Sequence, residues 1–556
     1  MKTSGVADFL DRRRFLAGSV GVAATLGVLG PATLPSSAPA AGNKAFPHGI
    51  ASGDPLPNAV VLWTRVTPVS YAQPGSGLGG PVAVRWEVSR DADFTEIVQF
   101  GVVKTDASRD HTVKLDAIGL EPATSYFYRF AYGTEHSPVG RTRTAPAPDS
   151  NPEQLRFGVV SCANWEAGYF STYRHLAARG DLDAVIHLGD YLYEYEPGKY
   201  SCGHHNEVIR EHVPAREIVS LRDYRERHAQ YKTDADLQAL HAAVPFIVTW
   251  DDHEVADGNW AKGAFEHQSK REGPYSRRKR AAQQAYDEWM PVRISGTAVS
   301  GDGERIYRRL QFGQLMDLSM LDLRSYRTDR VTPGDPGIDD RSRSITGNAQ
   351  LDWLTDNLSA TPTRWKLIGN PVMIAPVLLP PRPAIEEFAL GQTVSFTPLK
   401  ASAPNTDGWD GYGADRRRLL DHLVSESIDD VVFLTGDVHT AWANDVPAGP
   451  DGAPVATEFV CSSITSNNVD DFIGARPRTV SLSLEAAIQG ENPHVRFVNL
   501  DDHGYSVLNV TNTHVRMDWY AISDRRDASA GTHRLASWSV QSGRPRVEPV
   551  RHHANA

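Results

Sequence analysis

Cysteine is scarce in this chain of 556 residues, where only Cys162, Cys202 and Cys461 occur. Three thiols allow one disulfide at most, which excludes a disulfide-stapled scaffold. Positive charge is also in short supply: 57 Lys and Arg stand against 68 Asp and Glu, for a formal net charge of −11. We therefore expect no nucleic-acid partner, because net charge alone would not hold a polyanion.

Long apolar segments are also missing, apart from one near the N-terminus. Residues 16–34 are apolar and rich in glycine and alanine, and they follow the segment Arg12-Arg13-Arg14-Phe15-Leu16, which resembles the twin-arginine export consensus. Ala38-Pro39-Ala40 is a plausible cleavage site. We predict a twin-arginine signal peptide over residues 1–40 and a secreted protein that uses the twin-arginine translocase. The alternative is a membrane anchor, which the glycines, Pro31 and the short run disfavour.

Residues 43–147 carry an all-β pattern, and a chain of this length is expected to hold two domains. Val82, Val84, Trp86 and Val88 alternate with other residue types, which is the period of a half-buried strand. Similar runs lie at 60–66, 97–103 and 126–132, with Gly, Pro and Asp between them. The segment 120–126 resembles the turn-then-tyrosine segment of fibronectin type III sandwiches. We predict a small fibronectin III-like β-sandwich domain.

Residues 154–550 follow a Pro-rich linker and have a different pattern. Short runs that are apolar throughout lie at 156–160, 184–188, 245–250, 365–369 and 431–435. Such runs are typical of strands covered on both faces. Leu351, Leu354 and Leu358 have helical spacing. Alternating strands and helices predict a layered α/β domain, and we expect the β pattern of residues 494–522 to complete a second sheet.

Polar side chains follow these strands, at the carboxyl ends where ligands of α/β folds gather. A lone Asp after a strand is more often a helix cap or a turn residue. Five such strand ends facing one crevice instead predict a multinuclear metal site. The segments are Ser161-Cys162-Ala163-Asn164, Gly189-Asp190 with Tyr193, Asp251-Asp252-His253-Glu254 with Asn259, Gly369-Asn370, and Gly436-Asp437-Val438-His439.

The order of these segments resembles the metallophosphoesterase superfamily, whose motifs run Asp-x-His or Asp-x-Gly, Gly-Asp-x-x-Tyr, Gly-Asn-His-Glu and Gly-His-x-His. Cys162 stands where the first aspartate is expected, and Asp252 and Asp437 stand where Asn and His are usual. With these departures the chain resembles the PhoD-type alkaline phosphatase family, which includes phosphomonoesterases and secreted calcium-dependent phospholipase D enzymes. The resemblance covers nearly the whole chain. It implies a four-layer metallophosphoesterase-like α/β sandwich after the β-sandwich domain.

The resemblance also implies a centre of Fe³⁺ and Ca²⁺. Carboxylate and amide oxygens suit calcium, and a bridging carboxylate lets two cations touch one phosphate. The implied ferric ligands are Cys162, Asp190, Tyr193 and His439, and the implied calcium ligands are the bridging Asp190 with Asp252, Asn259 and Asp437.

Two catalytic roles are predicted beside the ions. His253 would stabilise the transition state or protonate the leaving group. Arg278, or a neighbour in the run 277–280, would grip the phosphate, although this run is equally expected as a solvated helix face. Asp251 remains an alternative to Asp252. Residues 373–398, apolar and Pro-rich, are either a lid for an acyl chain or a packed connecting loop.

These features predict a secreted, metal-dependent phosphoester hydrolase. The first choice of substrate is a phospholipid, cleaved in the manner of phospholipase D to phosphatidate and choline. The alternative is an alkaline phosphatase that scavenges phosphate from monoesters. A different class, a binding protein with structural metals, is disfavoured by the open ligand set. We expect a monomer with at most peripheral contact to a membrane surface.

Overall fold

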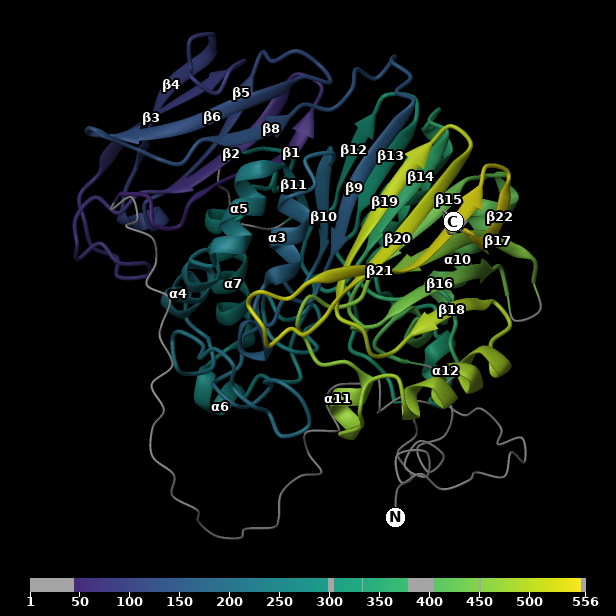
Figure 1. Cartoon of the computed structure of the whole chain (residues 1–556). Coiled ribbons are helices and arrows are strands. Elements are labelled where there is room, and N and C mark those ends of the chain that lie inside the picture. The colour runs from purple at the N-terminus through teal and green to yellow at the C-terminus, as the bar shows by residue number, and fades with distance from the viewer. Residues whose placement is uncertain (1–44, 299–304, 333, 379–404, 450–451, 552–556) are drawn as a thin grey trace.

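The computed structural model describes residues 45–298, 305–332, 334–378, 405–449 and 452–551 (Figure 1). The predicted signal peptide lies outside these residues, as does most of the segment 373–398. Within the described ranges, no helix combines the length and the apolar character that crossing a bilayer requires.

A ten-stranded sheet contains strands from both the N-terminal and the C-terminal parts of the chain. Its centre, β9–β10–β11, is parallel, and β19 adds to β9 in the antiparallel sense. The C-terminal β pattern therefore only partly completes a second sheet, because β19 to β22 extend this first one. In spatial order the strands are β22 (Arg544–Pro549), β21 (Thr532–Gln541), β20 (His514–Ile522), β19 (Gly504–Thr511), β9 (Gln154–Val160), β10 (Ala184–Leu188), β11 (Phe246–Thr249), β1 (Ile50–Leu56), β2 (Ala59–Arg65) and β5 (Thr112–Ile118).

A seven-stranded sheet packs face to face on the first. Its strands β13, β14, β15 and β17 are parallel. The core between the sheets includes Val159, Ile186, Leu318 and Leu434. In order, the strands are β12 (Arg308–Phe312), β13 (Met316–Met320), β14 (Trp365–Asn370), β15 (Val431–Thr435), β17 (Pro454–Val460), β16 (Ala441–Pro447) and β18 (Val495–Asn499).

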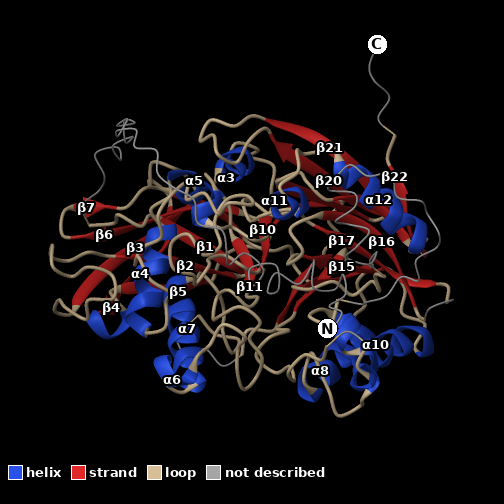
Figure 2. Cartoon of the chain, turned by 90° about the horizontal axis from the view of Figure 1, so that it is seen from below, coloured by secondary structure: helices blue, strands red, loops and turns tan. Residues whose placement is uncertain are grey.

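Helices cover the outer face of each sheet, which explains the continuous apolar runs. In β15, Val432 and Leu434 face the other sheet, whereas Val431 and Phe433 face the helices. Helices α8 (Asn348–Ala360) and α10 (Gly413–Ser425) lie together over the seven-stranded sheet (Figure 2). The ten-stranded sheet is covered by α3 (Ser171–Ala177), α4 (Leu221–Tyr231), α5 (Ala235–Ala243) and α7 (Tyr275–Trp289), with the short α6 (Ser269–Glu272) before α7; α11 (Val469–Ile473) and α12 (Val480–Glu491) flank β18.

The N-terminal β-sandwich is also present, and it shares a sheet with the catalytic domain. Its core, which includes Val60, Leu62, Val84 and Tyr128, lies between the β1–β2–β5 edge and a second sheet. Strand β1 pairs with β11 at Gly53, where a Cβ atom would lie 2.8 Å from the carbonyl oxygen of Phe246. The second sheet contains β4 (Ile97–Thr105), β3 (Val82–Ser89), β6 (Ser125–Tyr132) and β7 (Glu135–His136), with β8 (Gly140–Arg143) on β6.

These layers confirm the predicted fold class, an α/β sandwich of helices, sheet, sheet and helices preceded by a β-sandwich. The parallel strands of both sheets end toward the same region, which is where the predicted ligands lie.

Candidate metal centre

Four predicted ligands lie just after a strand and share an unusual backbone conformation. Cys162, Asp190, Asp437 and His439 have φ angles of 61°, 54°, 65° and 61°. Few residues other than glycine adopt this left-handed region, and its strain is typically stored at functional sites. The conformation turns the chain sharply at the ends of β9, β10 and β15.

Two glycines bring these strand ends close together. A Cβ atom on Gly189 would lie 2.5 Å from Cβ of Asp251, so the ends of β10 and β11 could not approach as they do. A Cβ atom on Gly436 would lie 2.9 Å from Cβ of Ser161. The glycine thus allows the end of β15 in one sheet to approach the end of β9 in the other. The glycines therefore permit the convergence on which the site depends.

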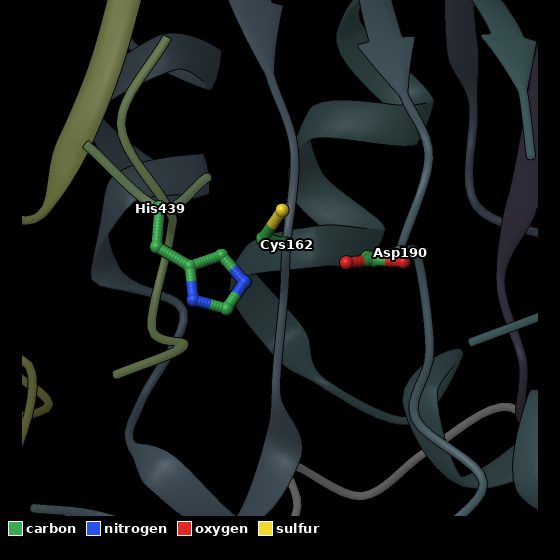
Figure 3. Close-up of side chains that lie close together, drawn as sticks. All are labelled: Cys162, Asp190 and His439. Atoms are coloured by element: carbon green, nitrogen blue, oxygen red, sulfur yellow. The ribbon is translucent and has the colours of Figure 1, made fainter. Parts of the chain in front are cut away.

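The first group of possible ligands is Cys162, Asp190 and His439, whose ligand atoms all lie within 4.8 Å of one another. Figure 3 shows these three buried side chains turned toward a common point. Tyr193 joins them, because its hydroxyl lies 3.0 Å from Oδ2 of Asp190 and 3.3 Å from Nε2 of His439. The structure thus brings together the four residues predicted to hold the ferric ion.

The imidazole of His439 is oriented for ligation by Nε2. Its Nδ1 lies 2.8 Å from the backbone oxygen of Asn467, an acceptor, so Nδ1 carries the proton. The lone pair of Nε2 then faces Asp190 and Tyr193. A backbone carbonyl on the far nitrogen is a common device for fixing a metal-binding histidine.

Two further groups continue from the first. Asp190, Asp252 and His253 form one, and Asp251, Asp252 and Asp437 form the other, each within the same 4.8 Å limit. Asp190 belongs to the first and second groups, and Asp252 to the second and third. This chain of shared carboxylates has the geometry of adjoining cation sites. Asn259 is buried in the loop after Asp252, and its amide stays a predicted ligand.

His253 is held by a carboxylate that the sequence patterns did not single out. Its Nδ1 lies 2.7 Å from Oε2 of Glu194, while Nε2 makes no hydrogen bond within the described part of the chain and lies 3.9 Å from Oδ1 of Asp252. Burial alone would lower the pKa of His253, but the charges of Glu194, Asp252 and Asp190 outweigh it and raise the pKa to about 10. In this arrangement the imidazole is a proton donor aimed at the carboxylates.

Arg324 is a second residue without a predicted role. Its guanidinium donates to both oxygens of Asp251, and it lies 3.5 Å from both Oδ2 of Asp252 and Oδ1 of Asp437. Because both oxygens of Asp251 bond to Arg324, we favour Asp252 over Asp251 as the cation ligand. The signal in the sequence was weak, because Asp322-Leu323-Arg324 follows strand β13, in which Asp317 and Ser319 interrupt the apolar pattern.

Glu254 organises the backbone of the two loops that carry the aspartates. Its carboxylate accepts from the backbone N–H groups of Asp190 at 3.1 Å, Tyr191 at 2.5 Å and Asp251 at 2.9 Å. Burial and the charge of Asp190 raise the pKa of Glu254 to about 8. The oxygens of Glu254 are therefore occupied by the backbone of these loops.

Two other residues expected at the site, Arg278 and Asn370, have their contacts outside the three ligand groups. Arg278 is buried in the helix layer, where its guanidinium bonds to Tyr224 at 3.1 Å, Glu217 at 2.8 Å and Glu272 at 3.1 Å. The amide of Asn370 accepts from the indole of Trp409 and donates to a backbone oxygen. Both contact sets hold the surrounding chain together, and nothing in residue spacing could have disclosed them.

Comparison with known proteins identifies the group to which this arrangement belongs. Residues 157–519 match a family model described as PhoD-like phosphatase, and residues 32–146 match the N-terminal domain of PhoD-like phosphatase. Alkaline phosphatase D of Bacillus subtilis (strain 168) is 37% identical over 97% of this chain and 89% of its own length. A solved structure described as that of PhoD is 35% identical with a TM-score of 0.80, over 93% of this chain and 94% of the other.

Proposed function

Since this chain belongs to the PhoD-like phosphatase family, we propose that it is a phosphoester hydrolase of the alkaline phosphatase type, acting on monoesters. The observation that carries the proposal is the sharing of Asp190 between two groups of buried ligands. A carboxylate shared in that way would hold two cations close together, and these would supply positive charge to a bound phosphate.

The donor chemistry supports a different cation in each place. Cys162, Asp190, Tyr193 and His439 offer thiolate, carboxylate, phenolate and imidazole, which fits the ferric ion implied by the family. Asp190, Asp252, Asn259 and Asp437 offer only oxygens, which fits Ca²⁺. When bound, the two ions supply positive charge to the phosphate oxygens and lower the pKa of a coordinated water. The identity of both ions is part of the proposal.

The chain's own residues supply the proton and position the carboxylates. Nε2 of His253 is buried, makes no hydrogen bond to the described residues and is directed toward Asp252, so it is the group that we propose donates a proton to the leaving oxygen. Arg324 keeps Asp251, Asp252 and Asp437 together at short range. The phosphate clamp predicted at Arg278 gains no support from its contacts with Tyr224, Glu217 and Glu272.

The choice between monoester and diester follows from the relatives rather than from the ligand set. Hydrolysis of either ester requires negative charge on the phosphate oxygens to be stabilised, so the cations and His253 would serve both. The alkaline phosphatase named above is similar over nearly the whole chain. We therefore place the monoesterase first and keep phospholipase D, the first choice from the sequence, as the alternative that an experiment must exclude.

A substrate comparison tests this choice. Phosphate release from p-nitrophenyl phosphate is measured beside choline release from phosphatidylcholine vesicles, on the same metal-loaded preparation. A monoester rate well above the choline rate is expected, and a dominant choline rate would overturn the monoesterase. EGTA should abolish both activities, and activity that survives EGTA would refute the calcium site.

We propose, finally, that the enzyme is exported and works outside the cytoplasm. The support is the resemblance of residues 12–16 to the twin-arginine consensus. Replacement of Arg12, Arg13 and Arg14 by lysine should retain the protein in the cell. Release into the medium by that variant would contradict twin-arginine export. The monomeric state and the peripheral membrane contact remain predictions.

A further inference from the structure

The turn 465–467, between β17 and α11, packs against the first group of ligands. Ser466 and Asn467 are buried, and they contact three of the four predicted iron ligands. Asn467 accepts from Nδ1 of His439 through its backbone oxygen. Ser466 reaches the other two, because its Oγ lies 2.6 Å from the hydroxyl oxygen of Tyr193 and 3.0 Å from the backbone oxygen of Cys162.

The Ser466 hydroxyl has one hydrogen to share between these two oxygens. A neutral Tyr193 has its own hydrogen to donate to Oδ2 of Asp190, and its oxygen can accept from Ser466. A Tyr193 phenolate has no hydrogen to give, and the neighbouring Asp190 carboxylate at 3.0 Å is an acceptor as well. Once the phenol loses its proton, as ligation requires, Ser466 is the donor placed to bond to it.

We propose that Ser466 is a positioning residue that donates a hydrogen bond to the Tyr193 phenolate and so sets its electron donation to the iron. The inference rests on the proposed iron site and deepens it. A hydrogen bond to a phenolate stabilises the electrons of its oxygen. The absorption band in which a phenolate transfers charge to ferric iron therefore lies at higher energy with Ser466 than without it.

The turn itself is held by contacts that do not involve the Ser466 hydroxyl. Arg525 donates to the backbone oxygen of Thr465 at 2.7 Å and to Oδ1 of Asn467 at 2.8 Å. The hydroxyl of Thr465 donates to the backbone oxygen of Asn164 at 2.7 Å, and Ser463 donates to that of Ser466 at 2.7 Å. Removal of one hydroxyl at Ser466 thus deletes the contact with Tyr193 while the turn keeps its anchors.

The test is the visible spectrum of the iron-loaded Ser466→Ala protein, with iron content measured in parallel. We expect the band to move to longer wavelength and iron to be retained about 10-fold less tightly. Thr465→Val is the matched control, because it removes a buried hydroxyl from the same turn that bonds to backbone and not to a ligand. Its band should stay at the wild-type position. A Ser466→Ala band at the wild-type position would overturn the inference.

A second measurement needs no variant and serves if Ser466→Ala fails to fold. The vibrations of the iron-bound tyrosinate are recorded by resonance Raman spectroscopy after iron is loaded in H₂O and in D₂O. A shift on deuteration is expected from a hydroxyl donor, and identical spectra would refute it. Wild-type protein that binds no iron and shows no band would instead refute the proposed iron site, so the two failures are distinguishable.

Discussion

Nδ1 of His253 lies 2.7 Å from Oε2 of Glu194, and both side chains are completely buried. The second oxygen of Glu194 accepts from the backbone N–H of Asp257 at 2.6 Å, which fixes the carboxylate in place. Burial opposes ionisation of Glu194, yet the positive charge of His253 keeps the pKa of Glu194 below its usual value. The pair therefore holds a charged imidazole whose Nε2 faces Asp252.

The first prediction concerns this pair. Glu194→Gln keeps the shape of the side chain but removes the charge that favours protonated His253, so kcat should fall about 10-fold or more while KM changes little. Steady-state kinetics on p-nitrophenyl phosphate provides the measurement. Glu266→Gln, which alters a half-exposed pair with Lys199, should leave kcat unchanged. Equal kcat in the wild type and Glu194→Gln would exclude a role for the pair in turnover.

The second prediction concerns the thiol in the first group. Cys162→Ala should lose iron and the visible band, because one of four close donors is removed. The chain offers a matched control in Cys461, which is also buried and whose thiol lies 3.4 Å from the hydroxyl of Ser161, outside the three ligand groups. Cys461→Ala should keep iron. Full iron content in Cys162→Ala, measured by plasma emission, would remove Cys162 from the ligand set.

The third prediction concerns Arg324. Lysine at this position keeps the charge but cannot donate to both oxygens of Asp251 at once. Arg324→Lys should weaken calcium binding and reduce kcat/KM about 10-fold or more, measured by calcium titration of activity. Arg309→Lys alters a pair with Asp317 in the seven-stranded sheet and should have no such effect. An unchanged calcium requirement in Arg324→Lys would contradict the role given to Arg324.

The fourth prediction concerns a cluster of buried basic residues between the ten-stranded sheet and its helices. His48, His187, His228, His241 and Lys232 are buried together, and burial lowers the pKa of each, that of His187 to about 3. Each group binds its proton more weakly in the folded chain than in the unfolded chain. Stability should therefore fall as pH drops below about 6.5 for the histidines and below about 10.5 for Lys232.

Lys232 isolates one part of this effect. Its Nζ lies 3.1 Å from Nε2 of His241 and over the ring of Trp63, and none of the carboxylates in the described ranges forms an ion pair with it. Lys232→Met removes the cost of burying this charge, on the order of 1–3 kcal/mol, so it should raise the Tm at pH 6. The difference in Tm between the variant and the wild type should shrink toward pH 10. Lys114, which is buried but paired with Asp287, is the matched control, and Lys114→Met should lower the Tm. A Lys232→Met Tm below that of the wild type at pH 6 would refute the argument.

The fifth prediction concerns the junction between the two domains. Asp54 in β1 accepts from Arg308 in β12 at 2.5 and 2.8 Å and from the backbone N–H of Arg293 at 2.7 Å. Asp54→Asn would leave buried Arg308 without its charge partner, at a cost of about 3–5 kcal/mol in unfolding free energy. Urea unfolding measures this cost. Asp116→Asn, at a partly exposed pair with Arg293, should cost far less.

The strands and the candidate ligands that follow them could be located because both depend on local patterns. The apolar runs before Cys162, Asp190 and Asp437 coincide with β9, β10 and β15, since a strand covered on both faces must be apolar throughout. Each predicted ligand follows its strand within two residues, so the carboxyl-end rule applies to it without any knowledge of long-range packing.

The roles of Glu194, Arg324 and Ser466 could not be predicted in this way. Glu194 contacts His253 59 residues away, and Arg324 contacts Asp251 73 residues away. For Arg278 the sequence predicted a role at the site, but its contacts lie inside the helix layer. No sequence spacing encodes such pairs, because they depend on how two sheets and their loops stack.

By itself, the sequence determined which residues end the buried strands, and with them the predicted Cys, Asp, Tyr and His donors of the site. Only the tertiary structure decided how these donors are held. Left-handed turns at Cys162 and Asp190 aim the side chains, and the backbone oxygen of Asn467 selects the tautomer of His439. The physical reason is that ligand type is a property of one residue, whereas orientation and charge depend on partners distant in sequence.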